Sequence, residues 1–451
     1  MHMNDTTIHQ HFRMPLTALA ILAAMVALAV TLPHPAGAMP VDAKGKPAQL
    51  TAPGSTQDSP QGREYRAGLQ ALLKGDWPAA SVHFEAALKL DPEAAPPLIG
   101  LATAAQARGD AKATEKYLQR AEKSAPSSAD VHLAWGRYHG SFGQPESALR
   151  SLRRAQELAP KWPAPLIELG DQYLRSGKMA DSQRVFREAV ALDSKNNAAL
   201  YGLGVASAGL GQRDEALRAF TAAAAAATKD PAPLRAAGRL HLEAKAFDKA
   251  LLAFDQGLGR QPNFVPLMLD RVEALMGLNR QADAIAQALA AEKLAPKSIE
   301  VQIRMADTYQ ALRRWSDAEV RYLKAIELAP RNAVAYNNLA WMTVERKGDA
   351  TKAVAWAKKA VDLSPGSAPF LDTLGWAERA AGNLQAATAS LSKAIQLEPN
   401  VAGYHFHLGV VQSELKQTTQ ARASLERALE LDKKLPQADQ ATQLLKALPN
   451  S

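Results

Sequence analysis

Small and bulky apolar residues recur at fixed intervals along this chain, with polar residues between them. The pattern repeats every 34 residues, which is the sequence signature of a repeat architecture. Only the ninth unit carries one extra residue, near Gly348. The units begin at Gln61, Ala95, Ala129, Pro163, Asn197, Pro231, Val265, Ile299, Ala333, Ala368 and Ala402, and the last one ends at Leu435. Eleven units therefore occupy residues 61–435.

Every unit has the same internal order of small and large positions. The eighth and twentieth positions are small and the twenty-fourth is often bulky, as Gly204, Ala216 and Phe220 illustrate. Missing side chains let two helices approach closely where they cross. Gly residues such as Gly143 stand where a first helix must end, and Pro residues such as Pro399 where a second must end. Gly supplies a left-handed cap and Pro cannot continue a helix, so each unit predicts a helix, a turn and a helix.

The residues of one late unit carry a family resemblance. Leu374-Gly375, Ala387, Leu391, Ala394 and Pro399 resemble the pattern of the tetratricopeptide repeat family. The resemblance covers about five-sixths of the chain and implies an all-α, right-handed superhelical solenoid of eleven helical hairpins. Residues 436–451 then read as a capping helix and tail, because Leu444, Leu445 and Leu448 are spaced to cover the open end of the stack.

The first sixty residues have a different composition. A weakly basic start leads into an apolar run, Met14 to Leu32, and then into Ala36-Gly37-Ala38. This order predicts a secretory signal peptide over residues 1–38, with cleavage after Ala38. The alternative is an uncleaved membrane anchor, because the apolar run approaches the length that spans a bilayer. Residues 39–60 have few apolar groups and predict a flexible linker. We expect the protein in the periplasm or cell envelope of a bacterium.

Composition narrows the chemistry available to the chain. Its 451 residues include no Cys, so disulfides, Cys-based zinc sites and lipid attachment to Cys are excluded. The net charge of +8 comes from scattered Lys and Arg residues, which is typical of a solvated surface. The glycines from Gly202 to Gly211 lack the spacing of a phosphate-binding turn. His405 and His407, two apart on a helix, point to different faces and make a poor metal pair, so we expect ordinary exposed or half-buried histidines. We expect no enzyme activity, cofactor or metal.

Binding to other proteins is therefore the leading hypothesis for function. Stacked hairpins generate a concave surface lined by first helices, which gives a groove for peptides or protein partners. The alternative is an acidic polysaccharide, favoured by the net charge and by arginines on the first helices: Arg137, Arg175, Arg235, Arg239 and Arg379. Acidic neighbours such as Asp171 and Glu243 dilute this signal, and export argues against nucleic acid.

Resemblance to particular tetratricopeptide subtypes is weaker. The fifth positions of the units lack the Lys of a carboxylate clamp, and only Asn338 stands at the sixth position, where a long Asn ladder would require many. The motifs NNLAWM, LDTLGW and YHFHLG are similar to exported repeat proteins of exopolysaccharide and exosortase systems.

A candidate protein-binding site lies near the C-terminal end. Trp341 and Trp376 share the ninth position of adjacent units, and Phe406 follows on the next first helix. Because equivalent positions of stacked hairpins become neighbours, we expect an exposed aromatic strip, with Asn337 and Asp372 as polar contacts beside it. The alternative is that both Trp side chains tuck between helices and serve packing.

Overall fold

The computed structural model describes residues 59–449, and every regular element within that range is an α-helix. The predicted signal peptide and almost all of the predicted linker lie outside the described residues; Pro60, assigned to the linker, is the first residue of α2. The first helices of the units are α2 (Pro60–Leu73), α4 (Ala95–Ala107), α6 (Ala129–Ser141), α8 (Pro163–Arg175), α10 (Asn197–Gly209), α12 (Ala232–Glu243), α14 (Val265–Gly277), α16 (Ile299–Ala311), α18 (Ala333–Glu345), α20 (Ala368–Ala380) and α22 (Ala402–Glu414).

The second helices alternate with the first along the chain. They are α3 (Trp77–Leu90), α5 (Ala111–Ser124), α7 (Pro145–Leu158), α9 (Met179–Leu192), α11 (Arg213–Ala226), α13 (Phe247–Arg260), α15 (Gln281–Leu294), α17 (Trp315–Leu328), α19 (Ala350–Leu363), α21 (Leu384–Leu397) and α23 (Thr418–Leu431). A final helix, α24 (Ala438–Ala447), follows them. The predicted all-α fold, with repeated helix pairs and a capping helix, is confirmed.

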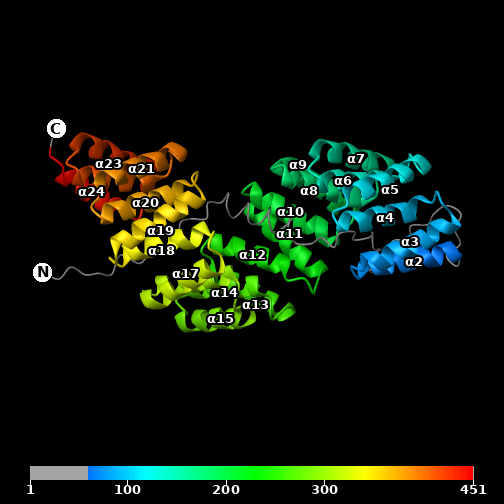
Figure 1. Cartoon of the computed structure of the whole chain (residues 1–451), viewed down its shortest axis with the longest axis horizontal. Helices are drawn as coiled ribbons and strands as arrows, with labels where there is room; N and C mark the ends of the chain where they lie inside the picture. The colour runs from blue at the N-terminus through cyan, green and yellow to red at the C-terminus, as the bar shows by residue number, and fades with distance from the viewer. Residues whose placement is uncertain (1–58, 450–451) are drawn as a thin grey trace. The chain divides into compact units, whose positions relative to one another are not determined.

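The described helices fall into two units, an N-terminal unit of α2–α12 and a C-terminal unit of α13–α24 (Figure 1). Within each unit a second helix packs on its own first helix and on the first helix of the following pair, as α9 does with α8 and α10. Neighbouring first helices also touch, as α18 and α20 do. Contacts between neighbours in sequence therefore build both units, as stacking of repeats requires.

Close approach within a pair depends on the small eighth position, as predicted. A Cβ built at Gly204 of α10 would lie 2.5 Å from the ring of Phe220 of α11, and one at Gly170 of α8 would lie 2.6 Å from Phe186 of α9. Both rings are fully buried. The aromatic ring at the twenty-fourth position therefore fills the space that the glycine leaves.

The turns inside the pairs use the left-handed conformation that the glycines predict. Six of them place Gly at φ between 70° and 78°, as Gly143 at 73° shows. Other turns place a residue with a side chain in the same conformation, for example Arg313 at 54° and Lys347 at 55°. The backbone shape is thus kept even where glycine is absent.

The extra residue of the ninth unit is absorbed in the turn between α18 and α19. Four residues, Arg346 to Asp349, separate these helices, whereas three separate α16 from α17. Gly348 donates its backbone N–H to the Thr343 carbonyl, and the Asp349 side chain caps α19 by accepting from Thr351 and Lys352. The insertion therefore changes the turn and leaves both helices at their usual length.

Candidate functional site

Polar side chains link several first helices to the next along a repeated pattern. The ninth position of one first helix meets the sixth position of the following one, and the twelfth position meets the thirteenth. The first kind of step includes Arg137–Glu168 at 2.6 Å, Glu273–Arg304 at 2.8 Å and Asp307–Asn338 at 3.3 Å. The second kind includes Gln106–Ser141 at 2.8 Å, Gln310–Glu345 at 2.8 Å and Arg379–Glu414 at 2.9 Å. We call the surface built by these positions in α14, α16, α18, α20 and α22 the first-helix face.

Trp376 stands at the ninth position of α20 and meets His407 at the sixth position of α22. The two rings stack with centroids 4.2 Å apart. The guanidinium of Arg379 lies 4.4 Å from the Trp376 ring centroid and also binds Glu414 of α22. Trp376 is half-buried and packs against the last apolar cluster of the C-terminal unit. Its indole is thus held by neighbours from two helices, which is characteristic of a pre-ordered anchor residue.

Two of the predicted rings lie beside the same histidine. Trp341 of α18 is half-buried, and its ring centroid lies 6.0 Å from that of His407. His407 is only 2% exposed, and its Nδ1 lies 2.7 Å from Oδ1 of Asp372. The expectation that His407 is an ordinary exposed or half-buried residue is therefore wrong. His405, two residues away, lies 2.8 Å from the Pro399 carbonyl in the preceding loop.

Phe406 does not belong to an exposed strip. It is 2% exposed and lies in the apolar cluster that joins α22, α23 and α24, together with Val410 and Leu425. This expectation is wrong because the fifth position of the last unit turns toward the core that the capping helix closes, while the sixth position, His407, takes the place beside the indoles.

The two predicted polar contacts are also more buried than expected. Asn337 and Asp372, at the fifth position of α18 and α20, are each 4% exposed. Asp372 reaches His407, whereas Oδ1 of Asn337 accepts no hydrogen bond. Both therefore lie below the two Trp side chains and not on the surface beside them.

The repeat positions point to His407 as a neighbour of Trp376, although the residue types alone did not. The pair Trp376 and His407 repeats the ninth-to-sixth step that joins Asp307 to Asn338. A search for complementary residues at these two positions of successive units would have selected His407 in place of Phe406.

The first helices of the N-terminal unit carry a separate cluster of charged side chains. Arg137 of α6 binds Glu168 of α8, and Asp171 and Arg175 lie on the same helix. The pKa of Asp171 is raised to about 8, mainly because the carboxyl is buried and secondly because it lies near the Glu168 carboxylate. Arg175 and Arg137 lower this pKa but do not offset the rise. Arg137 is paired with Glu168 here, which leaves that arginine little free positive charge to attract a polyanion.

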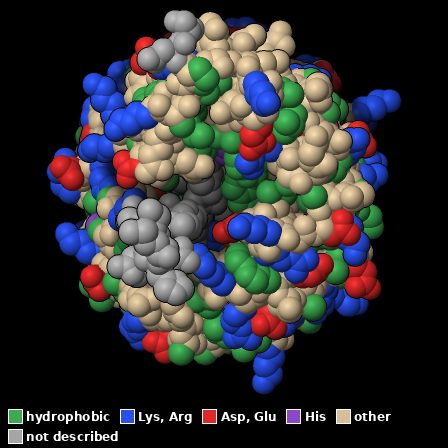
Figure 2. Space-filling view, turned by 90° about the vertical axis from the view of Figure 1, so that its left-hand side faces the viewer, with side chains coloured by type: hydrophobic (Ala, Val, Ile, Leu, Met, Phe, Trp, Pro, Cys, Tyr) green, Lys and Arg blue, Asp and Glu red, His purple; other side chains and the backbone are tan. Residues whose placement is uncertain are grey.

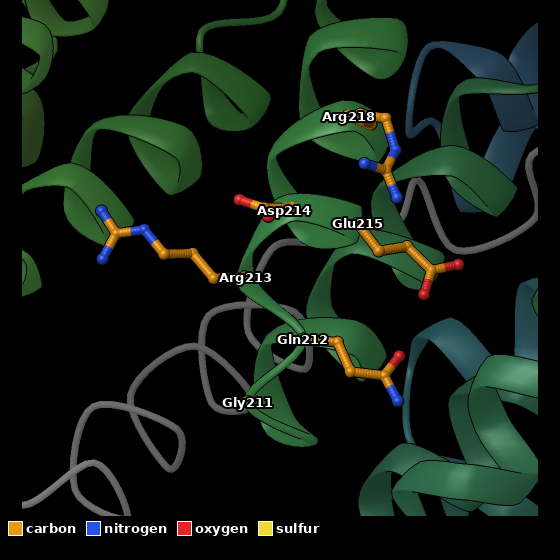
Figure 3. Close-up of a pocket in the computed structure, with 6 residues that line it drawn as sticks. All are labelled: Gly211, Gln212, Arg213, Asp214, Glu215 and Arg218. Atoms are coloured by element: carbon orange, nitrogen blue, oxygen red, sulfur yellow. The ribbon is translucent and has the colours of Figure 1, made fainter.

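A shallow depression lies at the start of α11 in the N-terminal unit (Figure 3). Glu215 already binds Arg187 of α9 at 2.7 Å and Gln183 at 3.0 Å, and Gln212 lies 2.5 Å from Gln183. Arg213 extends away from Gln212 and Glu215 (Figure 3). The lining side chains thus hold α9 and α11 together and do not converge on a ligand.

Within residues 59–449, no group of three or more His, Asp and Glu side chains is placed to hold a metal ion. None of the helices in that range is long and apolar enough to cross a membrane. The apolar run over residues 14–32 lies outside it.

Stacked pairs of antiparallel helices with polar steps between first helices define the class of helical repeat proteins. Residues 71–136 match one model of the tetratricopeptide repeat, and residues 167–231, 303–368 and 373–438 match another. These segments together span more than half of the 451 residues, and the chain belongs to the tetratricopeptide repeat family.

Solved structures share this fold at low sequence identity. The crystal structure of yeast Tom70 is 15% identical, with 87% of this chain and 96% of that chain covered and a TM-score of 0.51. A tetratricopeptide repeat protein from Parabacteroides merdae is 20% identical over 55% of this chain and 98% of its own, with a TM-score of 0.48. No curated protein matches the sequence. The likeness to Tom70 shows the fold alone.

Proposed function

We propose that the protein is a non-enzymatic scaffold of the bacterial cell envelope that binds a protein partner on the first-helix face of α18, α20 and α22. The observation that carries this proposal is the pair of half-buried indoles, Trp341 and Trp376, at one repeat position of adjacent first helices. Large aromatic side chains at a partly exposed surface are the usual anchors of protein recognition. Membership of the repeat family supports the same use of the fold.

An acidic polysaccharide is the weaker candidate. Arg137 and Arg379, two of the arginines that favour it, are bound to Glu168 and Glu414. Figure 2 shows Lys and Arg interspersed with Asp and Glu over the face that carries the C-terminal hairpins. Such mixed charge gives a polyanion few unopposed contacts. The salt dependence of binding distinguishes the two candidates. The affinity for a polyanion falls steeply as the salt concentration rises, whereas the affinity of apolar protein recognition changes little.

The setting in the envelope rests on the sequence of residues 1–38. Its order of basic start, apolar run and small-residue end supports export, and the C-terminal motifs support a place in exopolysaccharide export or envelope assembly. N-terminal sequencing of the exported protein should give Met39 as the first residue. Material that keeps Met1 in the membrane fraction would favour the anchor.

Affinity capture from envelope fractions tests the binding face. Trp341→Ala and Trp376→Ala are compared with wild type and with Trp315→Ala, a half-buried Trp that opens the second helix α17. We expect the first two variants to lose at least about 2 kcal/mol of binding free energy while the control retains capture. Each variant is also unfolded in urea. A loss of about 3 kcal/mol or more of stability with capture retained would show that both indoles serve packing alone.

A further inference from the structure

The steps α18–α20 and α20–α22 place the same repeat positions against one another. Only in the α20–α22 step does the side chain at the sixth position form a hydrogen bond with the side chain at the fifth. In the α20–α22 step, Asp372 at the fifth position and Trp376 at the ninth both contact His407 at the sixth position of the next helix. The imidazole lies 2.7 Å from the carboxylate and stacks on the indole with centroids 4.2 Å apart. His407 thus combines a hydrogen bond with flat aromatic packing.

One unit earlier, Asn337, Trp341 and Thr373 occupy these three positions. The extra residue of the ninth unit lies between Trp341 and Thr373 in the α18–α19 turn, outside both first helices. Asn337 is 4% and Thr373 is 1% exposed. Neither Oδ1 of Asn337 nor Oγ1 of Thr373 has a hydrogen-bond partner. Threonine is much shorter than histidine, so Thr373 does not make the bond that His407 makes.

Two buried polar atoms without partners on facing helices lower the stability of the fold. Such groups are uncommon in native proteins, and they concentrate where function requires them. Here both belong to the step that also contains Trp341, one of the two indoles of the proposed binding face.

We infer that the α18–α20 step of Asn337, Trp341 and Thr373 accepts a planar N–H donor side chain of the partner, an imidazole or a guanidinium, as the α20–α22 step accepts His407. This inference rests on the proposed binding of a protein partner. Oδ1 of Asn337 accepts the ligand N–H, and the flat group packs beside the Trp341 indole. Because Asn337 is neutral where Asp372 is charged, the site requires an N–H donor and not a full positive charge.

Entry of the ligand requires a side chain to turn. Oδ1 of Asn337 and Oγ1 of Thr373 have almost no solvent-accessible surface. Trp341 is only half-buried, so its indole is the group that moves. Binding should therefore change the fluorescence of Trp341.

Thr373→His is the decisive variant, because it adds to the chain itself an imidazole of the kind that the partner would otherwise supply. We expect the midpoint of urea unfolding to rise and partner capture to fall at least about tenfold. Thr373→Val should keep the fold with an equal or higher midpoint, since it removes an unpaired hydroxyl. Thr343→Val is the matched control: its hydroxyl donates to the Leu339 carbonyl on the same helix α18, so stability should fall while capture persists.

Two results overturn the inference. A lower unfolding midpoint for Thr373→His would show that no space for the ring exists at this step. A higher midpoint with undiminished capture would show that the partner does not use the step, although the proposed function would stand.

A peptide titration decides the inference even if wild type captures no envelope protein, the result that would reject the proposed function. The probes are acetylated Gly-Ser pentapeptides with a central His, Arg or Leu, titrated to about 10 mM because a single side chain binds weakly. We expect the His or Arg peptide to change the fluorescence of wild type and to have no such effect on Trp341→Phe or Thr373→His. Which of the two acts identifies imidazole or guanidinium. No response to either, or an equal response to Leu, overturns the inference.

Discussion

At the scale of single residues, stability depends on small side chains that face large ones. Gly204 and Phe220 show the principle, since the ring occupies the place where a Cβ would stand. The sequence predicts such pairs because a small eighth position and a bulky twenty-fourth position recur in most units. It does not predict the Asp372–His407 bond, which needs a carboxylate and an imidazole 35 residues apart to meet across two helices.

Gly204→Ala should lower the free energy of unfolding by about 1–3 kcal/mol, because its Cβ would overlap a fully buried ring that has no open space to move into. Urea unfolding followed by circular dichroism measures the loss. Gly259→Ala is the control: its Cβ meets nothing within 4 Å, so the better helix propensity of Ala should raise stability by about 0.5–1 kcal/mol. Equal losses in both variants would reject close packing as the cause.

Asp171 should make stability fall as pH rises. Its pKa is about 8 in the folded chain against an ordinary value of 3.8, so between these values the folded chain holds a proton that the unfolded chain has lost. The contribution of Asp171 to the free energy of unfolding is fully present below pH 3.8 and is lost as the pH rises toward 8. Asp171→Asn removes the dependence, so its advantage over wild type in urea midpoint should widen between pH 5 and pH 8. A constant difference across that range would contradict the raised pKa.

At the scale of helices, the repeat pattern predicts where elements begin and end, but not which side each position faces at the end of the stack. Phe406 was expected on the binding face because it follows Trp341 and Trp376 on the next first helix. Phe406 instead lies in the core that joins α22 to α23 and α24, and the fifth positions of the two preceding units, Asn337 and Asp372, are buried as well. The repeat therefore predicts which positions are equivalent but not that the fifth position faces inward.

Removal of residues 436–451 should destabilise α22 and α23 selectively. Ala441 and Leu448 close the apolar cluster that contains Phe406 and Leu425. Their loss exposes that cluster to water and should cost about 3 kcal/mol. Hydrogen exchange should become faster in α22 and α23, whereas substitution of the exposed Gln443 by Ala should leave exchange there unchanged. Unchanged exchange after the deletion would mean that α24 does not cap the stack.

At the scale of the whole chain, contacts inside each of the two units run from each helix pair to its neighbours in sequence. Polar steps between first helices follow the same rule. Stability is then a sum of terms for single pairs and their interfaces, and local loss need not spread to distant pairs.

Hydrogen exchange of Gly204→Ala tests this rule directly. The substitution weakens the packing of α10 on α11, and their nearest neighbours in the N-terminal unit are α9 and α12. We expect exchange to accelerate by roughly five- to hundredfold in these helices, in line with a local loss of about 1–3 kcal/mol. Peptides from α20 to α23 should exchange at the wild-type rate, because these helices belong to the C-terminal unit and pack on their own neighbours in sequence. The reciprocal variant, Gly409→Ala, whose Cβ would lie 2.7 Å from Leu425, should accelerate α22 and α23 and leave α8 to α11 unchanged. Uniform acceleration in both variants would show that the chain unfolds as one cooperative body, and the additive picture of its repeats would then be wrong.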